Sequence, residues 1–143
     1  MPCEYQVFED ENLVVKTYSG RVTPQCILDV LDRLEADPKY HEGMCELHDL
    51  RATTEFAFTE AEIAKLAELM AGINKRRQAP IRVATVADSA HTLKIASAYR
   101  QNLETISDMK IQICGTLQEA LVHLGRDADM FAKSKGQTGG TLH

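Results

Sequence analysis

MCELHDLRATTEFAFTEAE, residues 44–62, holds a strand pattern, a polar stretch and a helix start in succession. Within residues 44–50, Cys45 and Leu47 alternate with Glu46 and His48, which is typical of a half-buried β-strand. Thr59-Glu60-Ala61-Glu62 forms a capping box, in which the Thr59 hydroxyl accepts from the Glu62 N–H and Glu62 reaches back. We therefore expect a central strand over 44–50, a polar loop and a helix over 60–76. The C-terminal end of that strand is the expected functional edge.

The other elements follow from hydrophobic periodicity and from residues that begin or end helices. Extended runs around Asp10-Glu11-Asn12 predict a β-hairpin, and Ser19-Gly20-Arg21 interrupts the second run. Thr23-Pro24 begins a helix and Asp37-Pro38 ends it. A second capping box at Thr116 begins the last helix, with Gly125 as its C-cap. The predicted strands are 5–9, 13–19, 44–50, 81–87 and 109–114, and the predicted helices are 24–36, 60–76, 90–104 and 117–124.

This order, β-β-α-β-α-β-α-β-α, predicts an α/β fold with a mixed five-stranded sheet. Alternating strands and helices favour parallel β-α-β units with right-handed crossovers, and the first strand is antiparallel through its hairpin. Strands covered on both faces are usually apolar throughout, whereas these alternate. We therefore expect helices mainly on one face, with Glu46 and His48 on the uncovered one.

The chain of 143 residues has the size of one domain, which we place at residues 1–125. The hydrophobic pattern fades from Arg126, so residues 126–143 are expected to form a C-terminal extension that is flexible from about residue 134, where glycines gather.

Composition excludes several classes of protein. A net charge of −5 argues against nucleic-acid binding. The four cysteines form no C-x-x-C pair, which favours free thiols in a reducing compartment over a disulfide framework or a metal site. There is neither a signal-peptide pattern nor an apolar run long enough to span a membrane, so we expect a cytoplasmic protein. No motif predicts a cofactor.

Four stretches resemble the SpoIIAA-like proteins, a family often labelled STAS/SEC14-like: YSGRVT at residues 18–23, LHDLR at 47–51, RVATV at 82–86 and LQEALVHL at 117–124. The resemblance covers about residues 5–125 and contains no catalytic motif. It implies a β/α superhelix with a mixed sheet. SEC14 relatives bind lipids, so a small-molecule or lipid carrier is the alternative function that the resemblance implies.

Anti-sigma-factor antagonists of this fold carry a phosphorylatable serine, followed by Ser-Gly, where the helix after the central strand begins. Thr59-Glu60-Ala61 stands there in this chain. We interpret Thr59 as a helix cap, with phosphoacceptor as the alternative role.

Polar residues follow two neighbouring strands, where open α/β sheets usually bind ligands. Asp49 and Arg51 end the central strand, and Asp88 and His91 should lie beside them. These four residues would serve an undescribed enzyme as acid and base, but Asp49 is better interpreted as a structural partner of Arg51. Helix starts at the same edge also suit a small anion. The candidate ligand or partner contacts are Asp49, Arg51, Thr53, Thr54, Asp88, Ser89 and His91.

We interpret the chain as a non-enzymatic binding or regulatory module that acts through a protein partner or a small anionic or apolar ligand. An uncovered sheet face would also expose mixed apolar and polar side chains, which a homodimer would bury. The predicted interface residues are Tyr18, Met44, Glu46 and His48.

Overall fold

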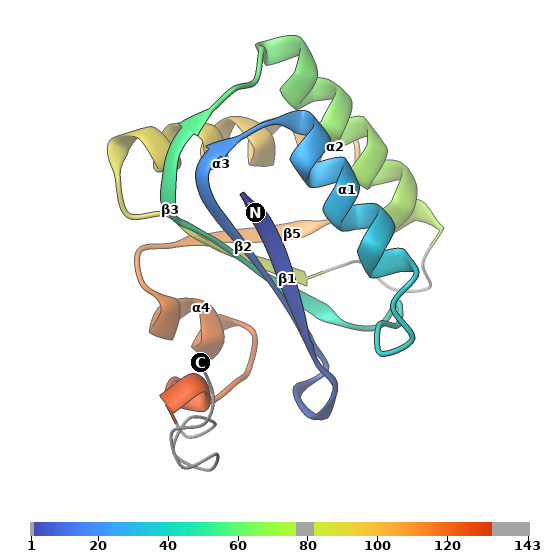
Figure 1. Cartoon of the computed structure of the whole chain (residues 1–143), viewed down its shortest axis with the longest axis vertical. Coiled ribbons are helices and arrows are strands. Elements are labelled where there is room, and N and C mark those ends of the chain that lie inside the picture. Colours follow the sequence, from blue (N-terminus) through green and yellow to red (C-terminus); the bar gives the residue numbers. More distant parts are fainter. Residues whose placement is uncertain (1, 77–81, 133–143) are drawn as a thin grey trace.

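A computed structural model describes residues 2–76 and 82–132 (Figure 1). The chain begins with a β-hairpin and then alternates helices and strands, as its sequence predicts. In order, the elements are β1 (Cys3–Phe8), the short 3-10 helix η1 (Glu9–Glu11), β2 (Leu13–Val22), α1 (Pro24–Glu35), β3 (Cys45–Phe56), α2 (Glu60–Lys75), β4 (Arg82–Val86), α3 (Ala90–Glu104), β5 (Lys110–Cys114) and α4 (Leu117–His123).

The five strands form one mixed sheet in the order β1-β2-β3-β4-β5. β1 pairs antiparallel with β2, and the other neighbours are parallel. Since parallel neighbours follow one another in sequence, right-handed crossovers bring α1, α2 and α3 to the same face of the sheet. The α/β class and the mixed five-stranded sheet are confirmed.

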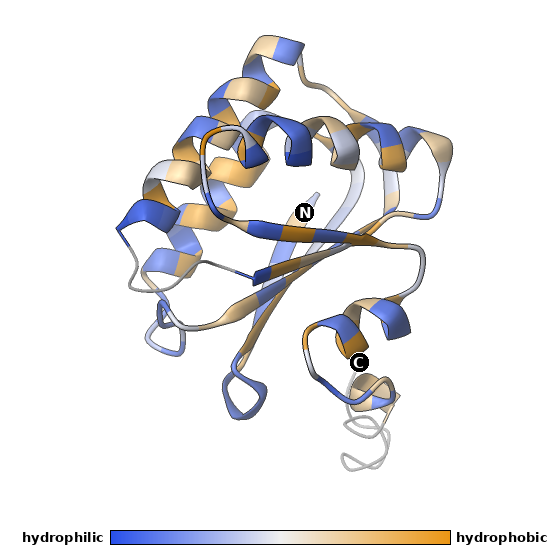
Figure 2. Ribbon diagram, turned by 180° about the vertical axis from the view of Figure 1, so that it is seen from behind, coloured by the Kyte–Doolittle hydropathy of each residue, from blue (hydrophilic) through white to orange (hydrophobic). Residues whose placement is uncertain are grey.

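α4 lies on the opposite face of the sheet, which no crossover rule predicts (Figure 1). It packs Leu121 and Leu124 against buried side chains of four strands, including Leu47 and Ala84. The alternation of the strands thus reflects two unlike faces, one under three helices and one under the short α4. Figure 2 shows this alternation along the strands from the reverse side.

The chain beyond residue 125 continues this packing as far as residue 132. Met130 is 7% exposed and belongs to the core cluster beneath α4. Phe131 lies against Phe8 with ring centroids 5.5 Å apart. Arg126 donates to the carbonyls of Glu11 and Asn12 over 2.8 and 3.1 Å. Residues 126–132 are therefore packed onto the domain, and the tail predicted to be flexible from about residue 134 lies outside the described residues.

The predicted placement of Glu46 and His48 on an uncovered face is wrong. The face that carries Tyr18, Glu46, His48 and Leu50 is the one beneath α1, α2 and α3, and Met44 packs against α1. Tyr18, Met44 and Glu46 are at most 6% exposed, so none of them presents a dimer surface. Alternation reveals which residues share a face of the sheet but not which face the helices cover. Glu46 and His48 were expected on the uncovered face because polar residues are usually exposed. Dimerisation itself stays a prediction.

β2 and β3 run further than predicted. Gly20 adopts a φ of +63°, which favours glycine, and the pairing register with β3 shifts on either side of it. The strand therefore bends at Ser19-Gly20-Arg21 rather than ending there. Its last residue, Val22, pairs with Phe56, so most of the predicted polar loop is strand.

The helix starts match their predictions. Thr59 Oγ1 accepts from the Glu62 N–H over 3.1 Å, and Glu62 Oε1 accepts from the Thr59 N–H over 2.9 Å. Ser89 forms the same reciprocal cap with Thr92 at the start of α3. Gly125, at a φ of +77°, follows α4. These local bonds fix where each helix begins and ends over the sheet.

Candidate functional site

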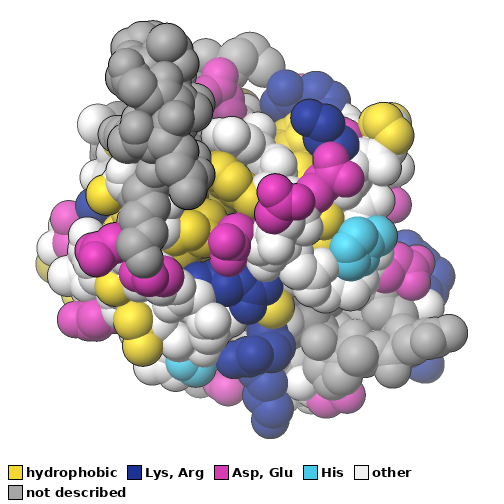
Figure 3. Space-filling model, turned by 90° about the horizontal axis from the view of Figure 1, so that it is seen from below, with side chains coloured by type: hydrophobic (Ala, Val, Ile, Leu, Met, Phe, Trp, Pro, Cys, Tyr) yellow, Lys and Arg dark blue, Asp and Glu magenta, His cyan; other side chains and the backbone are white. Residues whose placement is uncertain are grey.

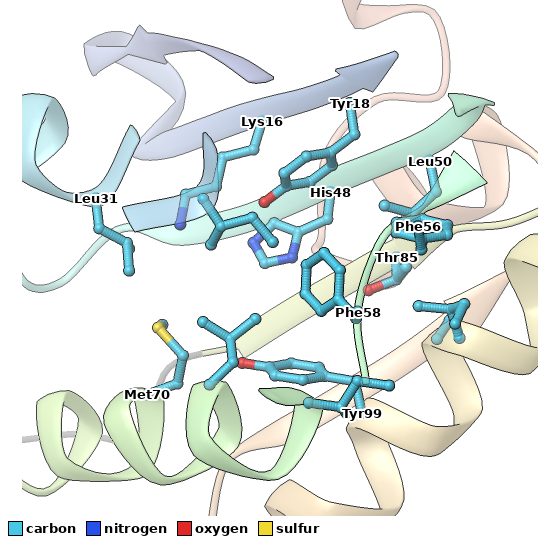
Figure 4. A pocket seen from close by; sticks show the side chains of 15 residues that line it. Lys16, Tyr18, Leu31, His48, Leu50, Phe56, Phe58, Met70, Thr85 and Tyr99 are labelled. Atoms are coloured by element: carbon cyan, nitrogen blue, oxygen red, sulfur yellow. The ribbon is translucent and has the colours of Figure 1, made fainter. Parts of the chain in front are cut away.

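A pocket lies between the sheet and the three helices that cover it (Figure 4). Its cavity measures about 80 Å³ and its walls are mainly aliphatic and aromatic. Small side chains at Thr85 and Ala96 leave this space open. Lining residues come from β2 (Lys16, Tyr18), β3 (His48, Leu50, Phe56), β4 (Thr85), α1 (Ile27, Leu31), α2 (Ile63, Leu66, Met70), α3 (Ile95, Ala96, Tyr99) and the segment before α2 (Phe58).

A buried three-residue network forms the polar end of this pocket. Glu46 Oε1 lies 2.9 Å from Lys16 Nζ and 2.8 Å from His48 Nε2. The side chains of Lys16 and Glu46 are 3% and 1% exposed, and that of His48 is 15% exposed. The three come together because β2 and β3 pair in register, with Val14 beside Glu46 and Lys16 beside His48. Buried ion pairs add little net stability, so such a network marks a candidate functional site.

The protonation states of the network follow from its geometry. Burial tends to raise the pKa of the Glu46 carboxyl, but Lys16 and the hydrogen bond from His48 hold that pKa well below its usual range. Burial lowers the pKa of His48 below its ordinary value of 6.5, with Glu46 acting in the opposite direction and Lys16 in the same one. At neutral pH the network therefore consists of an ammonium, a carboxylate and a neutral imidazole.

An ionised carboxylate can only accept hydrogen bonds, so His48 carries its proton on Nε2. Its Nδ1 is then a bare acceptor, and among the described residues it has no partner. The hydroxyls of Tyr18, Tyr99 and Thr85 also have no partner in the described part of the chain. Burial raises the pKa of both tyrosines, so their hydroxyls keep their protons. The pocket thus presents several polar groups that the protein itself leaves unused.

Two of the residues predicted to bind a ligand at the C-terminal edge, Asp49 and Arg51, bond to each other. Asp49 accepts from Arg51 through both carboxylate oxygens, over 2.9 and 3.0 Å, as its predicted structural role requires. Ser89 caps α3, and the exposed His91 ring lies 5.6 Å from that of Phe56. Thr54 and Asp88 are exposed, whereas Thr53 is buried.

Thr53 Oγ1 differs from the hydroxyls of the pocket because it is fully buried. In the described part of the chain it is the sole fully buried side-chain oxygen or nitrogen without a hydrogen-bond partner. It does not line the pocket.

Other site classes receive little support within residues 2–76 and 82–132. No group of three or more His, Cys, Asp or Glu side chains there is placed to hold a metal ion. No described helix is both long and apolar enough to cross a bilayer. On the face seen in Figure 3, acidic and basic side chains intermix around scattered hydrophobic atoms, so no charge of one sign dominates it.

Sequence reasoning missed Lys16, Tyr99 and the two phenylalanines of the pocket. The sequence did contain one indication of this site. Val14, Lys16 and Tyr18 lie on one face of β2, so Lys16 lies between two side chains that are buried. A lysine at such a position requires a buried partner. Glu46, on the next strand beside Val14, is that partner.

A comparison with solved structures agrees with this architecture. No protein-family model and no curated protein matches the chain. Among solved structures, it is similar to an uncharacterized protein from the DUF3478 family with a SpoIIAA-like fold, from Shewanella loihica PV-4. The two chains are 13% identical with a TM-score of 0.54, and the match covers 85% of this chain and 91% of that one. This chain therefore has a SpoIIAA-like fold.

Proposed function

We propose that the protein is a non-enzymatic binding module that takes a small, mainly apolar molecule into the pocket beneath α1, α2 and α3. The observation that carries the proposal is the pocket itself: aromatic and aliphatic walls with unused polar groups at one end. Ligand sites commonly combine an apolar lining with a few convergent polar groups that fix the ligand's orientation.

Energetics support an occupant for this space. Contact between water and the apolar walls of this pocket costs about 25 cal/mol per Å² of apolar surface. The unpartnered hydroxyls of Tyr18 and Tyr99 add a further cost if neither water nor a ligand reaches them. A molecule that fills the cavity and bonds to these groups would recover both.

The same observations favour the pocket over the C-terminal edge as the binding site. Asp49 and Arg51 already satisfy each other, and Ser89 is used as a cap. A catalytic role for Asp49, Arg51, Asp88 and His91 gains little support from an Asp49 whose two carboxylate oxygens both accept from Arg51. The pocket therefore supports the carrier function that the family resemblance implies.

A thermal-shift assay with benzyl alcohol, benzoate and toluene tests the proposal. We expect at least one compound to raise the melting temperature at millimolar concentration. Ala96→Leu, which places three more carbon atoms at the pocket wall, should abolish that rise. Ala36→Leu, at an exposed position after α1, is the matched control and should keep it. A rise that survives Ala96→Leu, or no rise with any compound, contradicts the proposal.

A further inference from the structure

We propose that the pocket takes a small carboxylic acid with an apolar body and binds it together with one proton, which His48 holds in the complex. This inference rests on the proposed function and names the chemical class of the ligand. It is carried by the balance of donors and acceptors around the pocket, and by the charge of the network behind it.

The polar groups on the pocket surface are mostly donors. Lys16 uses one N–H toward Glu46 and has no other partner among the described residues. The hydroxyls of Tyr18, Tyr99 and Thr85 keep their protons free to donate. The bare Nδ1 of His48 is the single obligate acceptor among the lining side chains, since Glu46 lies behind them and does not line the cavity.

A carboxyl group complements this arrangement. Its two oxygens can accept from Lys16 and the tyrosine hydroxyls, while its one acidic proton meets the lone pair of His48 Nδ1. An alcohol offers a single oxygen, and a primary amide brings two donors to a surface with one obligate acceptor. Of these small groups, the carboxyl therefore forms hydrogen bonds with the largest number of unpaired donors and acceptors in the pocket.

The net charge of the buried site requires that a carboxylate ligand binds together with one proton. By itself the network is neutral, because Lys16 balances Glu46 and His48 is uncharged. A bare carboxylate would leave an excess negative charge beside Glu46 in a buried site, which is unfavourable. With His48 protonated, two cations face two anions and the site is neutral again.

Glu46 is the other deprotonated titratable group of the network, but Lys16 and His48 hold its pKa well below its usual range, so His48 is better placed to take that proton. β2 presents Lys16 and Tyr18 to the pocket, β3 presents His48, with Glu46 behind it, and α3 presents Tyr99. α1 and α2 line the pocket with apolar side chains alone, and β4 contributes Thr85. Lys16 is already protonated, and the tyrosines hold their protons at neutral pH.

Isothermal titration calorimetry with benzoate and with benzyl alcohol tests the inference. Fragments of this size bind with a Kd on the order of 0.1–1 mM. In phosphate and in Tris at pH 7.5, which differ in ionisation enthalpy, benzoate should take up about one proton per site. Its Kd should rise about tenfold per pH unit above neutrality, as proton linkage requires. His48→Gln should remove both the uptake and the slope, whereas His123→Gln, at an exposed position on α4, should keep them.

The outcomes separate the two proposals. If benzyl alcohol binds as tightly as benzoate and benzoate takes up no proton, the pocket binds small molecules but the acid inference is overturned. If benzoate binds with a proton uptake that His48→Gln does not change, the proton resides elsewhere and the role of His48 is wrong. If neither compound binds to the wild type up to 20-fold above about 1 mM, both proposals fail.

Discussion

Replacing Lys16 with methionine should be among the most damaging single substitutions in this protein. Methionine matches the length and apolar stem of lysine but removes the charge that faces Glu46 at 2.9 Å. Glu46 is 1% exposed, so the variant leaves a buried carboxylate with His48 as its sole remaining partner among the described residues. Breaking a buried pair in this way costs about 3–5 kcal/mol of the free energy of unfolding.

Urea unfolding followed by circular dichroism at pH 7.5 measures this cost. For a slope m of about 2 kcal/mol per M, the midpoint should fall by about 1.5–2.5 M. Lys110→Met, on the exposed side of β5, is the matched control and should stay within about 0.5 kcal/mol of the wild type. Because Lys16 lowers the pKa of His48, its removal should let His48 protonate more readily, so the loss should be smaller at pH 6 than at pH 8.

The double variant Lys16→Met/Glu46→Met sharpens the test. Removing both charges leaves no buried ion, so most of the lost stability should return, and the remaining cost of about 1 kcal/mol reflects the lost hydrogen bond of His48. A single Lys16→Met variant that loses less than about 1 kcal/mol would refute the reasoning. So would a double variant as unstable as the sum of the two single ones, because additivity means that the charges do not interact.

Three further predictions concern His48, a helix cap and the chain after α4. Since the folded pKa of His48 lies below the 6.5 of the unfolded chain, stability should fall as the pH drops below about 6.5, by up to about 1.4 kcal/mol per pH unit from this group; His48→Gln should flatten that part of the urea-derived profile, and an unchanged slope would contradict it. Thr59→Ala should cost about 1 kcal/mol in the same assay and Thr59→Asp almost nothing, because aspartate also caps; equal losses would argue against the cap. Met130→Ala should cost about 2–5 kcal/mol because its side chain lies in the core beneath α4, and a loss under 0.5 kcal/mol would place residue 130 outside the core.

The elements and their order could be predicted because their signals are local. The Thr59 and Ser89 caps each form hydrogen bonds within four residues of chain. The side chains of a strand alternate between the two faces of the sheet regardless of which elements cover those faces. Sequential strand order with right-handed crossovers then gives the three-helix layer without knowledge of any long-range contact.

The position of the candidate site could not be predicted in the same way. Glu46 and His48 read as surface residues because each is polar, and their burial depends on a lysine 30 positions from Glu46 in the sequence. The pocket also depends on Tyr99, whose hydroxyl reaches the pocket from α3. α4 crosses to the other face after the last strand, where no parallel partner constrains its direction. These features arise from packing between distant elements rather than from any local pattern.

Methyl NMR of protein labelled at the methionine methyl groups tests the central claim most directly. Met70 lines the pocket, whereas Met130 lies in the core cluster on the opposite face of the sheet, so one spectrum contains both the probe and its control. On titration with benzoate or benzyl alcohol, the account predicts a saturable shift of the Met70 signal and a stationary Met130 signal. A Met70 signal that stays in place while either compound binds, or one that moves no more than Met130, would contradict a ligand site beneath α1, α2 and α3.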